Sequence, residues 1–150
     1  MIVPAMADPG PQFRAAADWF MDHTPHLKAL GLRFHDAGPG WAELALPYGP
    51  DLVAYPETGV IASGAVFSLM DTAAGLAVLI RRGRVEPHAT LDLRCDYLRA
   101  AEPEKTVIGH AECYRITRRI AFVRGIAHDG DPERPIANIA GTFMFTDPAL

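Results

Sequence analysis

The fold is decided by residues 63–82, which read SGAVFSLMDTAAGLAVLIRR. Ser63 predicts an N-cap, because its hydroxyl can accept a free backbone N–H of the first turn. Gly83 suits the C-terminal cap, and two arginines precede it where the helix dipole favours cations. Between these ends, apolar residues cover nearly every face: Ala65, Val66, Phe67, Leu69, Met70, Ala73, Leu76, Ala77, Val78 and Ile80. A helix that is apolar all round is buried, so other elements must wrap it.

The wrapper is predicted downstream of this helix. Four segments read as long strands: Thr90–Leu98, Thr106–Ile116, Ile120–His128 and Ile136–Thr146. The first alternates strictly, with Leu91, Leu93, Cys95 and Tyr97 on one face. Because the connections are short, we expect an antiparallel meander curved around the helix, in an α+β domain.

The segment upstream of residue 63 completes the predicted domain. Helical spacing runs from Pro11 to Leu30 and is interrupted at Pro25. Residues 32–35 and 41–46 read as short strands around a turn at 36–40, which brings the sheet to five or six strands. The loop from Pro47 to Thr58 is a candidate binding element, because long loops inside small domains are often functional.

Length and composition predict one acidic globular domain. The chain has 150 residues, 49% of them hydrophobic, and a formal net charge of -4, which argues against intrinsic disorder and against a nucleic-acid partner. We expect a flexible tail over residues 1–10 and a single domain over 11–150. The two cysteines cannot form a disulfide framework, and the N-terminus lacks a secretory signal, so a cytoplasmic location is expected. No membrane span is expected, since the most apolar run, Gly64 to Ile80, is short and contains Asp71.

Asp71 is the residue that does not fit its surroundings. It lies in the middle of the most apolar segment, where an unpaired carboxylate is costly to bury. One interpretation is a carboxylate satisfied by Thr72 or nearby backbone. The other is a general base or nucleophile in an apolar cleft. The physics of the sequence alone leaves both open.

The segment from Gly59 to Gly75, GVIASGAVFSLMDTAAG, resembles the helix signature of the hotdog-fold thioesterases of the phenylacetate-degradation (PaaI-type) family. The order of elements from about Leu27 to Thr146 is similar too. The resemblance implies a long central helix wrapped by a curved antiparallel sheet. It also implies an enzyme that hydrolyses aryl or fatty acyl-coenzyme A (acyl-CoA) to a carboxylate and free CoA, without a cofactor.

The resemblance also implies roles for individual residues. Asp71 takes the place of the general base or nucleophile, and Thr90 that of the hydroxyl residue that assists it. The backbone N–H of Ser63, at the helix start, would polarise the thioester carbonyl, as a helix N-terminus can do for a developing oxyanion. Because the helix start and the carboxylate of one site come from opposite subunits in this family, the resemblance implies a homodimer or homotetramer.

The helix start departs from the family pattern. Members usually have His-Gly-Gly where this chain has Ala62-Ser63-Gly64, and an Asn or Gln at the position of Pro56. Loss of an orienting side chain typically lowers a rate by orders of magnitude. The alternatives are therefore a non-catalytic protein that binds acyl-CoA and a structural subunit without a ligand.

The resemblance places the CoA phosphates at the end of the first long strand and in the next turn. The matching residues here are Tyr97, Arg99, Ala100, Thr117, Arg118 and Arg119. Adjacent arginines suit a phosphate, although a solvated basic turn is an equally good interpretation of Arg118 and Arg119. No metal site is expected, because the histidines lack ligand spacing, and no glycine-rich nucleotide loop or nucleophile elbow is present.

Overall fold

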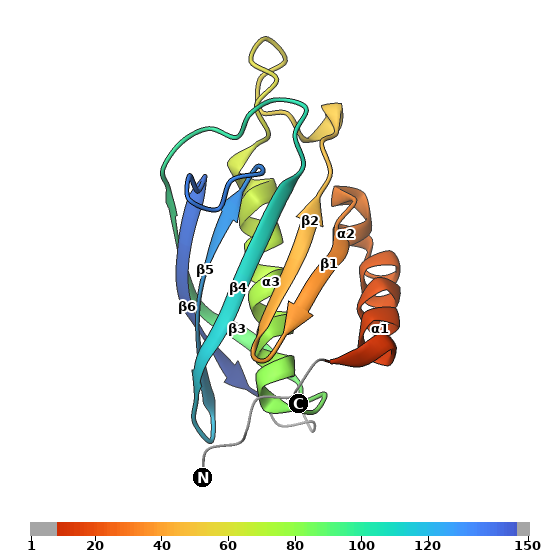
Figure 1. The fold of residues 1–150 in the computed structure, drawn as a ribbon, viewed down its shortest axis with the longest axis vertical. Helices are drawn as coiled ribbons and strands as arrows, with labels where there is room; N and C mark the ends of the chain where they lie inside the picture. Colours follow the sequence, from red (N-terminus) through yellow and green to blue (C-terminus); the bar gives the residue numbers. More distant parts are fainter. Residues whose placement is uncertain (1–8, 147–150) are drawn as a thin grey trace.

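One antiparallel sheet wraps around one long helix, and two further helices lie beside the sheet (Figure 1). The computed structural model describes residues 9–146. Its elements are α1 (Gly10–His23), α2 (Pro25–Leu30), β1 (Arg33–Gly38), β2 (Trp41–Leu46), the 3-10 helix η1 (Pro50–Leu52), α3 (Ser63–Arg82), β3 (His88–Tyr97), β4 (Val107–Ile116), β5 (Ile120–His128) and β6 (Ala137–Phe145). The predicted α+β class, with a central helix and six antiparallel strands, is confirmed.

The strand order is β1-β2-β4-β5-β6-β3, so the predicted four-strand meander is wrong in one respect. Strands β4, β5 and β6 do follow one another, but β3 pairs with β6 at the far edge and β2 pairs with β4. The reason is the length of the connection over residues 98–106, which can cross the end of the sheet, whereas hairpin loops need only about 2–5 residues. This order makes β3 an edge strand.

Helix α3 has the predicted bounds, Ser63–Arg82, but not the predicted N-cap. The cap is Ala62, in extended conformation, and no side chain caps the helix, so Ser63 is the first helical residue. At the other end Gly83 adopts a φ of 74° and donates to the carbonyls of Leu79 and Ile80, as predicted. The helix start therefore leaves its backbone N–H groups without a capping side chain.

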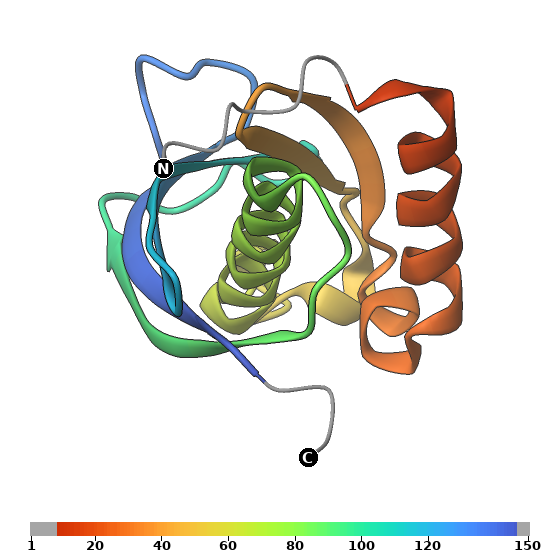
Figure 2. The same cartoon turned by 90° about the horizontal axis from the view of Figure 1, so that it is seen from below.

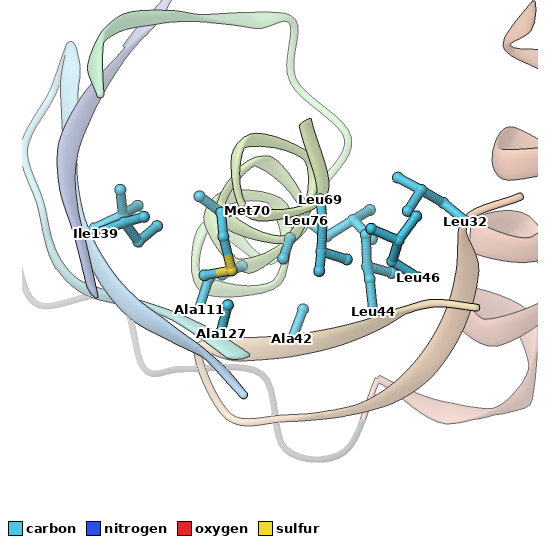
Figure 3. Packing of buried hydrophobic residues seen from close by; sticks show 14 of the residues in the cluster. Leu32, Ala42, Leu44, Leu46, Leu69, Met70, Leu76, Ala111, Ala127 and Ile139 are labelled. Carbon is cyan, nitrogen blue, oxygen red and sulfur yellow. The ribbon is translucent and has the colours of Figure 1, made fainter. Parts of the chain in front are cut away.

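The core lies between α3 and the concave face of the sheet (Figure 3). Leu69 and Met70 point from the helix toward small residues of neighbouring strands, among them Ala111 and Ala127. Gly109 permits the close approach, since a Cβ there would lie 2.8 Å from the Met70 sulfur. Figure 2, along the helix axis, shows the sheet curving around α3 and the two N-terminal helices outside β1.

Helix α3 is not buried on all faces, contrary to prediction. Its sheet-facing residues are covered, but a strip from Ser63 to Leu79 stays at least partly exposed, including Phe67, Asp71 and Gly75. The helix is long and apolar enough to cross a membrane by length and composition alone, yet 56% of that stretch is buried inside the protein, as in a core helix. The sequence shows the apolar character of the helix but not which side the sheet leaves open.

A β-bulge interrupts the predicted alternation of β3. The register with β6 shifts between Thr90 and Asp92, and Leu91 is left 58% exposed instead of facing the helix. A bulge adds one residue to one strand, so the alternation of side chains between the two faces of the sheet is reversed on one side of the bulge relative to the other. Thr90, on the other side of the bulge from Asp92, consequently faces α3.

The remaining elements differ from the predictions by small shifts. Pro25 separates α1 from α2 as expected, while the turn between β1 and β2 shortens to Pro39 and Gly40, whose φ is 77°. The predicted tail, residues 1–10, lies largely outside the described residues, although α1 already begins at Gly10. The division into this tail and a single domain over 11–150 stays a prediction.

Candidate active site

The hydroxyl of Thr90 donates a hydrogen bond to the carboxylate of Asp71, with 2.7 Å between Oγ1 and Oδ1. Asp71 is half-buried on the uncovered strip of α3, and Thr90 lies near the start of β3 beside the bulge. A hydrogen bond to an ionised group is about twice as strong as a neutral one. It fixes one carboxylate oxygen, and the second oxygen can accept a proton.

Both residues line an open groove of about 480 Å³ along the strip of α3. The N-terminal helices form one wall with Phe20 and Leu27, and the opposite wall contains His88 of β3 and Phe143 of β6. A volume of this size is typical of small-molecule sites. The groove thus combines a positioned carboxylate with mostly apolar walls.

The start of α3 faces a second cavity, also of about 480 Å³, which is lined by Ser63, Tyr97 and Ala100 among others. The Tyr97 hydroxyl donates to the carbonyl of Ser63 over 3.0 Å. Burial raises the pKa of Tyr97 to about 12, so the phenol stays protonated at neutral pH and keeps this bond. Gly64 is exposed beside Ser63, and the Ala62 N–H donates to the carbonyl of Leu52 over 2.8 Å.

A single chain does not bring Ser63 and Asp71 to one reacting atom. The two residues are eight positions apart on a continuous helix, which separates them by about 12 Å along the axis. They also line different cavities. Within one chain, the carboxylate and the helix start therefore belong to different cavities.

Arg99, a predicted phosphate ligand, is held by a buried carboxylate. Its guanidinium donates to both oxygens of Asp129 over 2.6 and 3.0 Å and to the carbonyl of Arg134 over 2.6 Å. Pairing with Arg99 holds the pKa of Asp129 well below its usual range. This contact ties the segment after β3 to the turn after β5, and the role of Arg99 toward a phosphate stays a prediction.

The other predicted CoA contacts lie apart in one chain. Thr117, Arg118 and Arg119 form the exposed turn between β4 and β5, and the Arg119 carbonyl accepts from the N–H of Phe145 beside the start of β3. Tyr97 is the last residue of β3, at the opposite end of the strand, and the residues up to Ala100 follow it. Pro56 is exposed in the loop before α3, where its neighbours Tyr55 and Thr58 line the second cavity.

Comparison with known proteins identifies the family. Residues 58–136, more than half of the chain, match the family model described as the Thioesterase superfamily. The chain belongs to the thioesterase superfamily. It is therefore a thioester hydrolase of α+β hotdog fold, as its resemblance to the PaaI-type family implied.

Solved structures and a curated relative agree with this membership. A Pseudomonas aeruginosa protein of known crystal structure is 41% identical, with a TM-score of 0.80 over 89% of this chain and 98% of that one. A mutant of the phenylacetic acid degradation protein PaaI from Thermus thermophilus is 28% identical, with a TM-score of 0.70 over 81% and 99%. The medium/long-chain acyl-CoA thioesterase YigI of Salmonella typhimurium is 28% identical over 144 residues, which cover 87% of this chain and 92% of YigI.

The groove of this thioesterase contains polar residues that the sequence did not single out. His26 of α2 contacts the Ser68 hydroxyl, with 3.1 Å between Nε2 and Oγ. Ser68 lies three residues before Asp71, so helical spacing predicts that both side chains lie on the same face of α3. Helical spacing does not predict that His26 and His88 approach this face. Among residues 9–146, no three His, Cys, Asp or Glu side chains are grouped so as to hold a metal ion.

Proposed function

We propose that this thioesterase hydrolyses acyl-CoA, with Asp71 as general base and Thr90 as the residue that positions it. The observation that carries the proposal is the 2.7 Å hydrogen bond between their side chains at the wall of the groove. The name of YigI, a medium/long-chain acyl-CoA thioesterase, supports the substrate class. The alternative interpretation of Asp71, a structural carboxylate that accepts a hydrogen bond from Thr72, is disfavoured because the Thr72 hydroxyl donates to the Ser68 carbonyl.

The reaction follows from the groups at hand. Asp71 accepts a proton from water while the water oxygen forms a bond to the thioester carbon. The negative charge that develops on the carbonyl oxygen is stabilised by the N–H of Ser63 at the helix start. The carbon–sulfur bond then breaks and the acyl group leaves as a carboxylic acid. CoA leaves as the thiolate and takes up the proton that Asp71 had accepted, which restores the carboxylate. A covalent acyl-Asp71 detected by mass spectrometry would instead assign the carboxylate as nucleophile.

We propose that two subunits complete each site. About 12 Å separates Ser63 from Asp71 in one chain, so the N–H and the carboxylate of one site must come from different chains. Strand β3 supports pairing, because it is a ten-residue edge strand with neighbours on one side only, and uncovered edges of this length invite pairing. The opposite edge strand, β1, packs against α1.

Two further parts of the proposal concern the nucleotide of CoA and the location of the enzyme. Arg118 and Arg119 are exposed on one turn, where two guanidinium groups can bind phosphate.

Cys95 and Cys113 are both free thiols, which supports a reducing cytoplasm. Burial raises the pKa of Cys113 to about 11, so that thiol is unreactive at neutral pH.

The test is a thiol-release assay over aryl and fatty acyl-CoA esters. Wild type should turn over part of the panel, Asp71→Asn should lose at least about 10²-fold in kcat, and Asp18→Asn, an exposed carboxylate of α1 outside the groove, should not. Turnover by Asp71→Asn at the wild-type rate would refute the assignment. Calorimetric binding of acyl-CoA without turnover would favour the non-catalytic alternative.

A further inference from the structure

A serine of the groove is hydrogen-bonded to a histidine of the neighbouring helix. The Ser68 hydroxyl of α3 lies 3.1 Å from Nε2 of His26 in α2, and both residues line the groove that contains Asp71. Ser68 and Asp71 are three positions apart on α3, so their Cβ atoms are separated by about 5–6 Å on one face of the helix. One water molecule, at about 2.8 Å from each oxygen, can bridge two side chains at this spacing.

The water that attacks a thioester is best held by two hydrogen-bond acceptors. It donates one hydrogen to the base, and a water with no other contact can still rotate about that hydrogen bond. A second acceptor takes the other hydrogen and leaves a lone pair of the water oxygen fixed in direction. This matters because a reacting group that is misplaced by about 1 Å can lower a rate by about 100-fold.

Ser68 is placed to be the second acceptor. The Thr72 hydroxyl is not, because Thr72 is adjacent to Asp71 in the helix and adjacent residues do not face each other. The Thr90 hydroxyl donates its hydrogen to Oδ1 of Asp71 and leaves the other carboxylate oxygen to the water. A hydroxyl has one hydrogen and two lone pairs. When Nε2 of His26 accepts the hydrogen of Ser68, the Ser68 oxygen offers only lone pairs to the groove.

We propose that Ser68 holds the attacking water together with Asp71, and that His26 is a positioning residue that keeps the Ser68 oxygen an acceptor. The inference rests on the proposed function. The water donates one hydrogen to Asp71 and the other to Oγ of Ser68, and its lone pair forms the bond to the thioester carbon while Asp71 takes the first proton. The second hydrogen stays on the oxygen that becomes part of the carboxylic acid. Ser68 and His26 therefore neither gain nor lose a proton.

The experiment measures kcat and KM by thiol release with the acyl-CoA ester that wild type hydrolyses fastest. Ser68→Ala should lower kcat by about 10- to 100-fold and leave KM near the wild-type value, because it releases the water and not the substrate. His26→Ala should lower kcat by about 2- to 10-fold, the value of one neutral hydrogen bond. In a Ser68→Ala background, His26→Ala should have no further effect on kcat, since His26 acts only through the Ser68 hydroxyl.

Two amide variants of His26 distinguish the hydrogen bond from the mere presence of a polar side chain. The amide oxygen of glutamine is as many bonds from Cβ as Nε2 of histidine, whereas that of asparagine is as many bonds away as Nδ1. His26→Gln should therefore keep most of the wild-type kcat, and His26→Asn should behave like His26→Ala. His23→Ala is the matched control, because His23 is exposed at the end of α1 and its Nδ1 contacts only the carbonyl of Trp19 in its own helix.

The outcomes separate this inference from the function on which it rests. If wild type hydrolyses no acyl-CoA ester, the proposed function fails. If wild type is active but Ser68→Ala keeps the wild-type kcat, or changes KM alone, only the inference is overturned. An acyl group detected on Ser68 by mass spectrometry would assign it as a nucleophile and would overturn the inference as well. Should Ser68→Ala fail to fold by circular dichroism, equal kcat values for His26→Gln and His26→Asn would overturn it.

Discussion

Removal of one backbone N–H at the start of α3 should abolish most of the activity and leave the fold intact. Ser63 is the first helical residue, where proline is well tolerated, because the N–H at that position has no partner within the helix. Ala62 has φ −60° and ψ 137°, the extended conformation that a residue before proline prefers. Ser63→Pro should therefore fold normally, while the loss of an oxyanion donor lowers kcat by about 10²- to 10³-fold. Ser63→Ala keeps the N–H and should lose far less.

The same variant tests whether each site spans two subunits. Co-expressed Ser63→Pro and Asp71→Asn chains should pair at random, so half of the dimers are mixed. One site of each mixed dimer then combines an intact Ser63 with an intact Asp71, and the other site has neither. The mixture should recover about a quarter of the wild-type activity per chain, although each variant alone is nearly inactive.

The measurement is thiol release by the co-purified mixture, with two affinity tags to demonstrate that mixed dimers form. Mixed dimers without recovered activity would refute the assignment of the helix start and the carboxylate to different chains. Undiminished kcat for Ser63→Pro would refute the role of the N–H itself. Thermal unfolding of each variant supplies the control for folding.

Three other perturbations have defined outcomes. Thr90→Val removes the hydroxyl that is hydrogen-bonded to Asp71 and should lower kcat by about 10- to 150-fold, the value of a charged hydrogen bond. The same change in an Asp71→Asn background should lower kcat little further. Equal losses of kcat in both backgrounds would show that Thr90 acts independently of Asp71. Asp129→Asn should destabilise the fold by about 1.5–3 kcal/mol at neutral pH. Because the pKa of this carboxyl is depressed in the folded state, the wild-type advantage in chemical denaturation should shrink as the pH falls below about 4, and a constant difference would contradict the ion-pair argument. Replacement of Arg118 and Arg119 by alanine should raise KM for acyl-CoA but not for an acyl thioester of N-acetylcysteamine, which lacks the phosphates; equal changes for both substrates would exclude a phosphate contact.

The sequence by itself determined the elements whose signals are local. Helix α3 was predicted with its correct bounds, because its hydrophobic content and its C-terminal glycine act over a few residues. The same holds for the break at Pro25 and for the existence of the later strands. Asp71 stood out for a local reason as well, since a carboxylate is conspicuous in an apolar helix.

The tertiary structure decided what depends on contacts between distant residues. Strand β3 lies beside β6 because pairing is set by the whole sheet and not by chain order. Thr90 faces Asp71 only because a bulge, defined by the register with β6, reverses the alternation of the strand. Arg99 is held by Asp129, thirty residues further along the chain. The sequence thus shows which residues can do chemistry, while the pairing of strands determines which of them meet, because register and long-range contacts have no local signal.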